Sequence, residues 1–418
     1  MTGRAATTRY LDRYAEPQSQ APWPFAAQRF DVAIVVPAYD ERRTFIDDAL
    51  EHDAAASFVL IVVVNTRRDC AAEAIQRTTD LLNVVPGPEF RPCATDIGRA
   101  WLDDDGRRGL WLIDCVERFE PDDGVGLARK IGLDVALAHF HTGNVRRSLI
   151  LCTDADASLP PGYCQQQLPP EVSALTFGFR HVGVGALEHA QLVYDQRLRD
   201  YPRELARAGS PYGFQALGSA MAVSASHYAQ AGGCPRRQAG EDFHLLAKLA
   251  KLGRVEHRGE VEIRLRARES ERVPFGTGPG VLKLSQHNDP FAVAFFINAR
   301  SFEFLSWLLK QLKLAVEDAR DDAATRLNIA LREHMRTVGL LSNADDVVGL
   351  EAMSHAVDRA RAASPDAMRR VQHIMTWFDA LKTLRLLHRL RDAGWADVSF
   401  HDLKEHEPAR LARGSAAT

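Results

Sequence analysis

The sequence predicts an α/β protein in which a mainly parallel β-sheet carries helices on both faces and a helical C-terminal region follows. In the first half of the chain, apolar runs that are typical of buried strands alternate with helical stretches, the runs lying at 31–37, 58–64, 109–115 and 148–152. From about residue 291 onward, apolar residues instead recur at helical spacing. We therefore expect the sheet first and the helices after it.

Composition limits the function classes that need to be considered. The chain has 418 residues, enough for two or three domains, and its net charge of -3 argues against a general nucleic-acid binder. The six cysteines are scattered, which predicts free thiols in a reducing compartment. Because no apolar leader or stretch of about eighteen apolar residues is evident, we expect a soluble cytoplasmic protein.

We expect four segments along the chain. Residues 1–29 are polar and contain prolines, which predicts an extended arm, and residues 30–265 hold the alternating strands and helices. Residues 266–285 form a basic, glycine-rich loop in this interpretation, and residues 286–418 form a helical domain. The apolar faces of these C-terminal helices predict a domain core or a homodimer contact, with peripheral binding to a membrane surface as the alternative.

The most informative stretch is the apolar run at 148–152, which ends at two aspartates one residue apart, Asp154 and Asp156. Ligands of open α/β sheets bind outside the carboxyl ends of the strands, so this position is a candidate site. Two carboxylates there suit Mg²⁺ or Mn²⁺, which commonly carry a nucleotide diphosphate. The alternative is a polar turn in which Asp154 caps the next helix.

Three motifs occur in order along the chain, and together they resemble the inverting glycosyltransferases of family 2, which have the GT-A nucleotide-sugar fold. The first is the strand end at 36–41, the second is Asp154-Ala155-Asp156, and the third combines residues 218–223 with Gly240-Glu241-Asp242. The resemblance covers about residues 30–265 and implies transfer of a sugar from a nucleotide-diphosphate sugar to an acceptor hydroxyl. The family's processive QxxRW motif is absent, so we expect a non-processive enzyme.

The resemblance also implies catalytic roles for individual residues. Asp156 would be the closer metal contact, while Asp154 would meet the metal through water or hold the donor. Asp242 would be the general base that takes the acceptor's hydroxyl proton, with Glu241 beside it. The alternative for Glu241 and Asp242 is simple capping of the helix that follows Gly240.

The same resemblance places the donor along the first two strand ends. Tyr39 would cover the base, and Asp40 or Glu41 would take ribose hydroxyls, unless these two acidic residues only cap the helix that follows. The amide of Asn65, where many members have aspartate, favours a UDP-sugar. Basic side chains would bind donor phosphates or sugar oxygens. The donor-side candidates implied by the resemblance are Pro37, Ala38, Tyr39, Glu41, Asn65, Arg129, Lys130 and Asp154. Arg272 is added from the composition of its basic, glycine-rich segment, which could fold over a diphosphate or be a flexible linker.

Two other functions fit the same motifs. A nucleotidyltransferase on a related fold would also use a metal-bound diphosphate, but no glycine-rich, lysine-bearing loop follows the first strand. A non-catalytic GT-A-like module would bind a nucleotide without turnover. The sequence does not identify the acceptor, which could be a small molecule, a glycan or a lipid-linked sugar.

Overall fold

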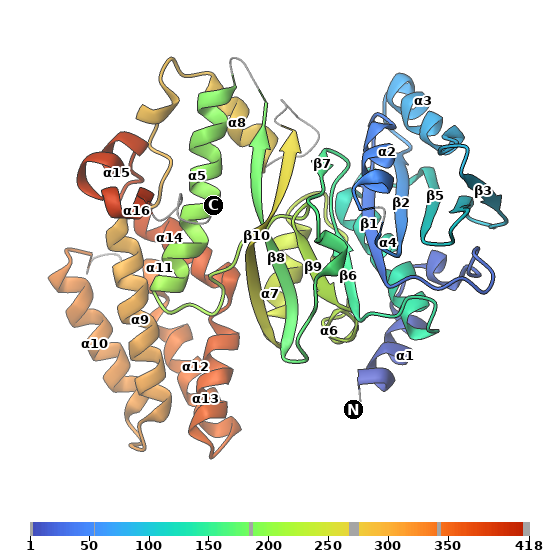
Figure 1. The fold of residues 1–418 in the computed structure, drawn as a ribbon. Coiled ribbons are helices and arrows are strands. Elements are labelled where there is room, and N and C mark those ends of the chain that lie inside the picture. The colour runs from blue at the N-terminus through green and yellow to red at the C-terminus, as the bar shows by residue number, and fades with distance from the viewer. Residues whose placement is uncertain (1–2, 54, 184–186, 267–275, 341–343, 413–418) are drawn as a thin grey trace. The chain divides into compact units, whose positions relative to one another are not determined.

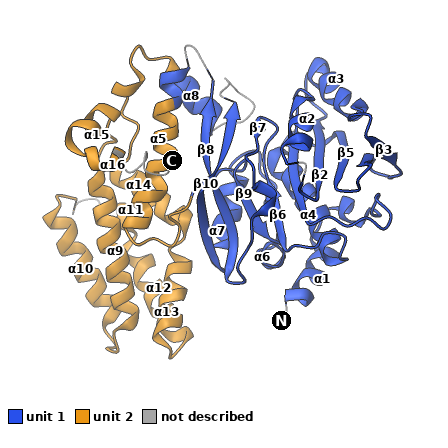
Figure 2. Cartoon of the chain, viewed as in Figure 1, with its two compact units in different colours: residues 1–191, 215–283 blue, residues 192–214, 284–418 orange. Residues whose placement is uncertain are grey.

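The computed structural model describes residues 3–53, 55–183, 187–266, 276–340 and 344–412. The chain divides into two compact units, shown in blue and orange in Figure 2. Unit 1 contains residues 1–191 and 215–283, and unit 2 contains residues 192–214 and 284–418. A segment from the middle of the chain thus belongs with the C-terminal helices.

Unit 1 is built on one ten-stranded sheet in the order β3-β4-β5-β2-β1-β6-β9-β8-β10-β7 (Figure 1). Its central strands are buried along almost their whole length because they are continuous apolar runs. The strands are β1 (Val32–Ala38), β2 (Phe58–Arg67), β3 (Phe90–Cys93), β4 (Gly98–Asp103), β5 (Arg108–Phe119), β6 (Leu149–Cys152), β7 (Ala157–Ser158), β8 (Val172–Val182), β9 (Met221–Ser224) and β10 (Arg254–Arg266).

The sheet is mixed rather than mainly parallel. Strands β5, β2, β1 and β6 are parallel neighbours, as are β8 and β10, whereas β4, β9 and β7 run antiparallel to their neighbours. The antiparallel hairpin β3–β4 lies between the apolar runs at 58–64 and 109–115, and its two short strands were not among the strands that the sequence predicted. The expected α/β class is nevertheless confirmed, and the central strands lie where the apolar runs predicted them.

Helix α4 is the buried helix of unit 1. It packs on β1 and β2, and Gly132 brings it so close that an added Cβ would lie 2.4 Å from a methyl group of Val35. The unit's helices are α1 (Gly3–Arg13), α2 (Thr44–Glu51), α3 (Ala72–Asp80), α4 (Val125–His141), α6 (Ala225–Gln230), α7 (Glu241–Leu249) and α8 (Thr277–Ser285). Helix α5 (Glu188–Arg207) belongs to unit 2 from Leu192 onward. Short 3₁₀ turns are η1 (Pro17–Gln20), η2 (Leu81–Asn83) and η3 (Tyr163–Gln165).

The expectation of an extended N-terminal arm was wrong. Residues Gly3–Arg13 form helix α1, which packs against α6 and α4 and buries Thr7 and Tyr10. The sequence did not predict this helix, because its few buried side chains are polar or aromatic and form no aliphatic pattern at helical spacing. The Thr7 hydroxyl donates to the carbonyl of Gly3 at 3.0 Å and the Tyr10 hydroxyl to Asp134 Oδ1 at 2.7 Å, so burial here depends on hydrogen bonds.

The expected glycine-rich loop at 266–285 is only partly within the described residues. Residues Thr277–Ser285 form helix α8, in which Val281 and Leu284 are buried, so this part of the prediction was wrong. Apolar burial outweighs the low helix propensity of Gly278 and Gly280. Arg272 lies outside the described residues.

Unit 2 is helical, as the C-terminal periodicity predicted. Its core contains Phe302, Leu305, Leu308 and Leu312, which the sequence placed on one apolar helix face. Among the described residues, no helix combines the length and apolar character needed to span a membrane. The helices are α9 (Ala299–Glu317), α10 (Ala323–Thr337), α11 (Ala344–Val348), α12 (Leu350–Ala363), α13 (Ala367–Trp377), α14 (Ala380–Asp392), α15 (Phe400–His406) and α16 (Pro408–Ala412), with the 3₁₀ turn η4 (Pro290–Ala292).

Candidate active site

The sheet brings the sequence motifs to one edge. Strands β1, β2 and β6 are parallel, so the residues after Ala38, Arg67 and Cys152 all leave the sheet at their carboxyl ends. Strand β9 runs antiparallel to β6 and begins at Met221 opposite Cys152, so the residues before it reach the same edge. The candidate residues thus come together from segments far apart in the sequence.

Arg129 of helix α4 binds residues from several of the segments that meet at this edge. Its side chain is 1% exposed and donates three hydrogen bonds: Nη2 to Asp154 Oδ1 at 2.7 Å, Nε to Glu241 Oε1 at 3.1 Å, and Nη1 to the carbonyl of Gly218 at 3.1 Å. Burial alone would lower the pKa of Arg129, but Asp154 and Glu241 outweigh it and keep the guanidinium charged. Arg129 therefore joins the Asp154-Ala155-Asp156 motif to the Glu241-Asp242 pair.

Gly218 lies in close contact with the guanidinium of Arg129. A Cβ added to it would lie 2.5 Å from Nη2 of Arg129. Its carbonyl accepts from Arg129, and its N–H donates to Asp242 Oδ2 at 2.7 Å. This one glycine therefore connects the buried guanidinium to the predicted base. The sequence showed the glycine only as part of a motif and gave no sign of this contact.

The two acidic residues of the pair have different surroundings. Asp242 is half-buried, and its Oδ1 also accepts from the N–H of Phe243 at 2.7 Å, so two backbone donors fix its carboxylate. Glu241 is 3% exposed, and burial followed by repulsion from Asp242 raises its pKa to about 7, although Arg129 opposes the shift. Asp242 is therefore the more accessible carboxylate of the two.

The raised pKa of Glu241 leads to a test by stability. In the folded protein Glu241 stays protonated up to about pH 7. In the unfolded chain, where its pKa has the ordinary value of 4.5, the proton is already lost above pH 4.5. Folding therefore loses stability as the pH rises from about 4.5 to 7. We expect Glu241→Gln to become progressively more stable relative to wild type between pH 5 and pH 8 in thermal unfolding. Glu171→Gln, at an exposed site, is the matched control and should show no such trend.

Asp154 and Asp156 follow strand β6, as predicted, and both side chains are partly exposed. Asp154 Oδ1 is held by Arg129. The backbone of Asp156 is fixed beside β10, because its carbonyl accepts from the N–H of Arg266 at 2.9 Å. Both carboxylates are thus placed by neighbouring elements and remain accessible.

The donor set fits a divalent ion that also binds a ligand. Within the part of the chain that the structure describes, no three His, Cys, Asp or Glu side chains form a group that could hold a metal ion. Mg²⁺ is usually held by only one or two carboxylates, together with waters and substrate phosphates. Asp154 and Asp156 match that incomplete set. His257 of β10 contacts Thr176 Oγ1 at 3.1 Å within the sheet.

The loop after β1 is held by a residue that the sequence did not single out. Arg77 of helix α3 makes a bidentate ion pair with Asp40, Nε to Oδ1 at 2.6 Å and Nη2 to Oδ2 at 3.0 Å. Asp40 has a positive φ of 54°, and its N–H donates to Thr78 Oγ1 at 2.9 Å. These contacts fix the loop that carries Tyr39 and Glu41, both partly exposed.

Asn65 lies at the end of β2 and is 7% exposed. In the orientation that satisfies its amide, the side-chain nitrogen donates to the carbonyls of Ala38 at 3.3 Å and Val63 at 3.1 Å. The donor half of the amide is thus committed to the main chain of β1 and β2. Only its oxygen is left for a ligand, and Pro37 and Ala38 lie beside it in β1.

Lys130 does not join this cluster, although it follows Arg129 in sequence. Its Nζ lies 2.5 Å from Asp134 Oδ2, 2.9 Å from Tyr10 Oη and 2.8 Å from the carbonyl of Tyr14. It is buried among residues of helix α1 and the turn after it, so its ammonium group does not reach the edge where Arg129 meets Asp154 and Glu241.

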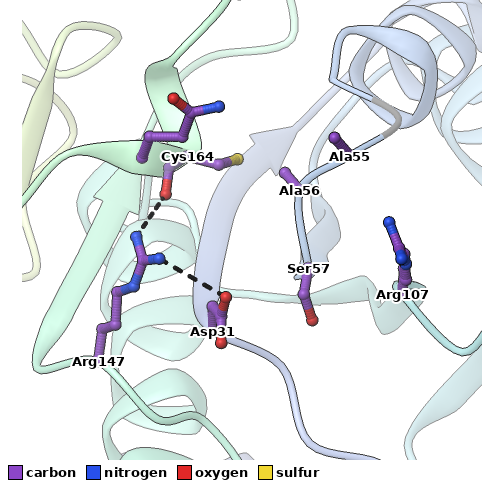
Figure 3. A pocket seen from close by; sticks show the side chains of 8 residues that line it. Asp31, Ala55, Ala56, Ser57, Arg107, Arg147 and Cys164 are labelled. Carbon is purple, nitrogen blue, oxygen red and sulfur yellow. Dashed lines mark hydrogen bonds and ion pairs between the residues drawn. The ribbon is translucent and has the colours of Figure 1, made fainter.

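A separate pocket lies at the opposite edge of the sheet (Figure 3). Asp31, Ser57 and Arg107 line it, and they directly precede strands β1, β2 and β5. Arg147 points toward Asp31 and donates to the carbonyl of Cys164 at 3.0 Å. Because it lies at the amino ends of the parallel strands, this pocket is not part of the candidate site.

Comparisons with known proteins do not assign a family. No family model matches the sequence, and no curated protein matches it. Among solved structures, the chain is similar to mannosyltransferase PcManGT from Pyrobaculum calidifontis in complex with GDP-Man and Mn²⁺, with 16% identity over 91% of this chain and 95% of that chain. The TM-score is 0.32, which is too low to support an argument about fold or function.

Proposed function

We propose that this protein is a non-processive, inverting glycosyltransferase that uses a nucleotide-diphosphate sugar. The observation that carries the proposal is the contact of one buried side chain, Arg129, with both Asp154 and Glu241. Such a transfer needs a pair of carboxylates that binds the metal of the metal–diphosphate. It also needs a separate carboxylate that accepts the proton of the acceptor hydroxyl. They meet where ligands of α/β sheets bind.

In the proposed reaction, Asp242 takes the proton of the acceptor hydroxyl while the acceptor oxygen forms its bond to the anomeric carbon. The bond from that carbon to the donor's diphosphate breaks in the same step, so the configuration inverts. Gly218 and Phe243 hold the Asp242 carboxylate in one orientation through their N–H groups, and its remaining lone pairs can accept the proton. Glu241 is buried against Arg129, and its role is to position the cluster.

Asp156 and Asp154 would hold Mg²⁺ or Mn²⁺, which neutralises charge on the departing diphosphate. Tyr39 and Glu41 would lie along the nucleoside, in a loop that Asp40 and Arg77 hold in place. The oxygen of Asn65 can accept from a base N–H, and uracil offers one such group next to a carbonyl. Guanine offers the same combination, so Asn65 no longer favours a UDP-sugar over a GDP-sugar.

A thermal-shift screen of nucleotide-diphosphate sugars, with and without Mn²⁺, tests the proposal. A ligand at 100 times its dissociation constant should add about 2.7 kcal/mol of stability, and the addition should require the metal. A donor found in this way can then be tested for transfer to acceptors. If no nucleotide diphosphate or its sugar stabilises the protein with Mn²⁺ or Mg²⁺, the proposal is wrong.

A further inference from the structure

The N-terminal segment is attached to the active-site helix through one buried carboxylate, Asp134. Its Oδ1 accepts from the hydroxyls of Tyr10 and Tyr228, both at 2.7 Å. Its Oδ2 accepts from the N–H of Glu16 at 2.8 Å and pairs with Lys130 Nζ at 2.5 Å. Asp134 and Tyr228 are 0% exposed, so a charge is buried here and is compensated within the network.

A second carboxylate extends the network to the loop before helix α7. Glu16 is 4% exposed, and it lies 3.4 Å from Lys130 Nζ and accepts from Arg236, from Nε at 2.9 Å and from Nη2 at 2.5 Å. The same loop passes directly over Tyr10, since a Cβ added to Gly233, which has φ +76°, would lie 2.0 Å from its hydroxyl. The segment thus contacts the loop at two points.

This loop is also packed against the start of helix α4. The N–H of Gly126 donates to the carbonyl of Arg237 at 3.0 Å, and a Cβ on Gly126 would lie 2.6 Å from that residue's backbone. Gly124 is equally close to Gln238. The loop then leads directly into Glu241 and Asp242. Helix α4 and the loop before helix α7, which hold the active-site cluster, are therefore both fixed to the N-terminal segment.

We propose that residues Gly3–Gln20 are a positioning device for the cluster of Arg129, Gly218, Glu241 and Asp242, with Lys130 and Arg236 as the positioning residues. Lys130 holds the turn of helix α4 that carries Arg129, and Arg236 holds the loop that leads into the acidic pair at the start of helix α7. The inference concerns the proposed active site, but the contacts exist without a ligand, so positioning can be tested independently of activity.

Amide hydrogen exchange provides the test, because the N–H groups of Gly218 and Phe243 donate to Asp242 and report directly on its position. We expect Arg236→Ala, whose side chain is 56% exposed, to speed exchange at these two amides by about tenfold while the amides of β1 and β2 keep their rates. Arg237→Ala, an exposed neighbour, is the matched control and should leave both amides unchanged.

A second pair of variants tests Glu16, the partner of Arg236 in the network. Glu16→Ala should give the same local pattern, and exposed Asp12→Ala should not. Combining Glu16→Ala with Arg236→Ala should add little to either change, because both remove the same contact. Unchanged exchange at Gly218 and Phe243, or an acceleration spread evenly over β1 and β2, would overturn the proposal. Neither readout depends on nucleotide binding, so failure of the proposed enzyme activity would be seen separately.

Discussion

Asp242→Asn should lower the rate of sugar transfer by about 10²- to 10⁴-fold, the usual contribution of a general base, while donor binding persists. Asparagine keeps the size of aspartate and can still accept from one of the two N–H groups through its single oxygen, but it cannot take a proton at neutral pH. The carboxylate is half-buried and is held by the N–H groups of Gly218 and Phe243. The variant should therefore fold, and its activity should separate from its affinity.

Steady-state turnover and calorimetric donor binding, measured with the donor that the screen identifies, would check this result. Glu241→Gln is the informative comparison, because Glu241 is buried against Arg129 and has no access to an acceptor. Near-normal turnover of Asp242→Asn would place the base elsewhere. NMR of the sugar product gives a separate check, since a retained anomeric configuration contradicts single displacement.

The sequence predicted the candidate site because strand ends are local features. An apolar run that stops at Asp154 marks both a buried strand and its tip, and parallel neighbours bring their tips to one edge. The helical C-terminal region was predictable for a similar reason, since its apolar period is long and regular. These predictions needed only short-range patterns.

The roles of Arg129 and Lys130 could not be predicted, because they depend on which way each side chain points. Successive residues on an α-helix differ in direction by about 100°, since there are 3.6 residues per turn. Arg129 therefore reaches Asp154 and Glu241, whereas Lys130 reaches Asp134. The basic pair was predicted to bind donor phosphate, but the guanidinium is buried and its three nitrogens all donate to protein acceptors.

Contacts between segments that are distant in the sequence could not be predicted either. The ion pair of Arg77 with Asp40 and the network around Tyr10 join residues far apart in the sequence, and no periodicity marks them. The N-terminal helix was missed for this reason, because its burial depends on partners that a local pattern does not contain. Polar burial is specified by the whole fold rather than by one segment.

Asp156→Ala should abolish metal-dependent donor binding and leave the fold intact. The Asp156 side chain is partly exposed in the turn between β6 and β7, and its backbone contact with Arg266 does not need the carboxylate. Surface substitutions of this kind usually change stability by no more than about 0.5 kcal/mol. Asp154 provides a contrast, because its carboxylate also pairs with buried Arg129, and its removal should lower the melting temperature as well.

Calorimetry of the identified donor with Mn²⁺ distinguishes the two aspartates. Loss of an outer partner of a metal typically costs about 10- to 100-fold in affinity, and we expect Asp154→Ala to fall in that range. Asp156→Ala should exceed it, because the proposal makes Asp156 the direct ligand. Asp104→Ala, at an exposed carboxylate in the turn between β4 and β5, is the control and should bind normally. If Asp156→Ala binds the donor as wild type does and still requires the metal, Asp156 is not a ligand and the ion is held elsewhere.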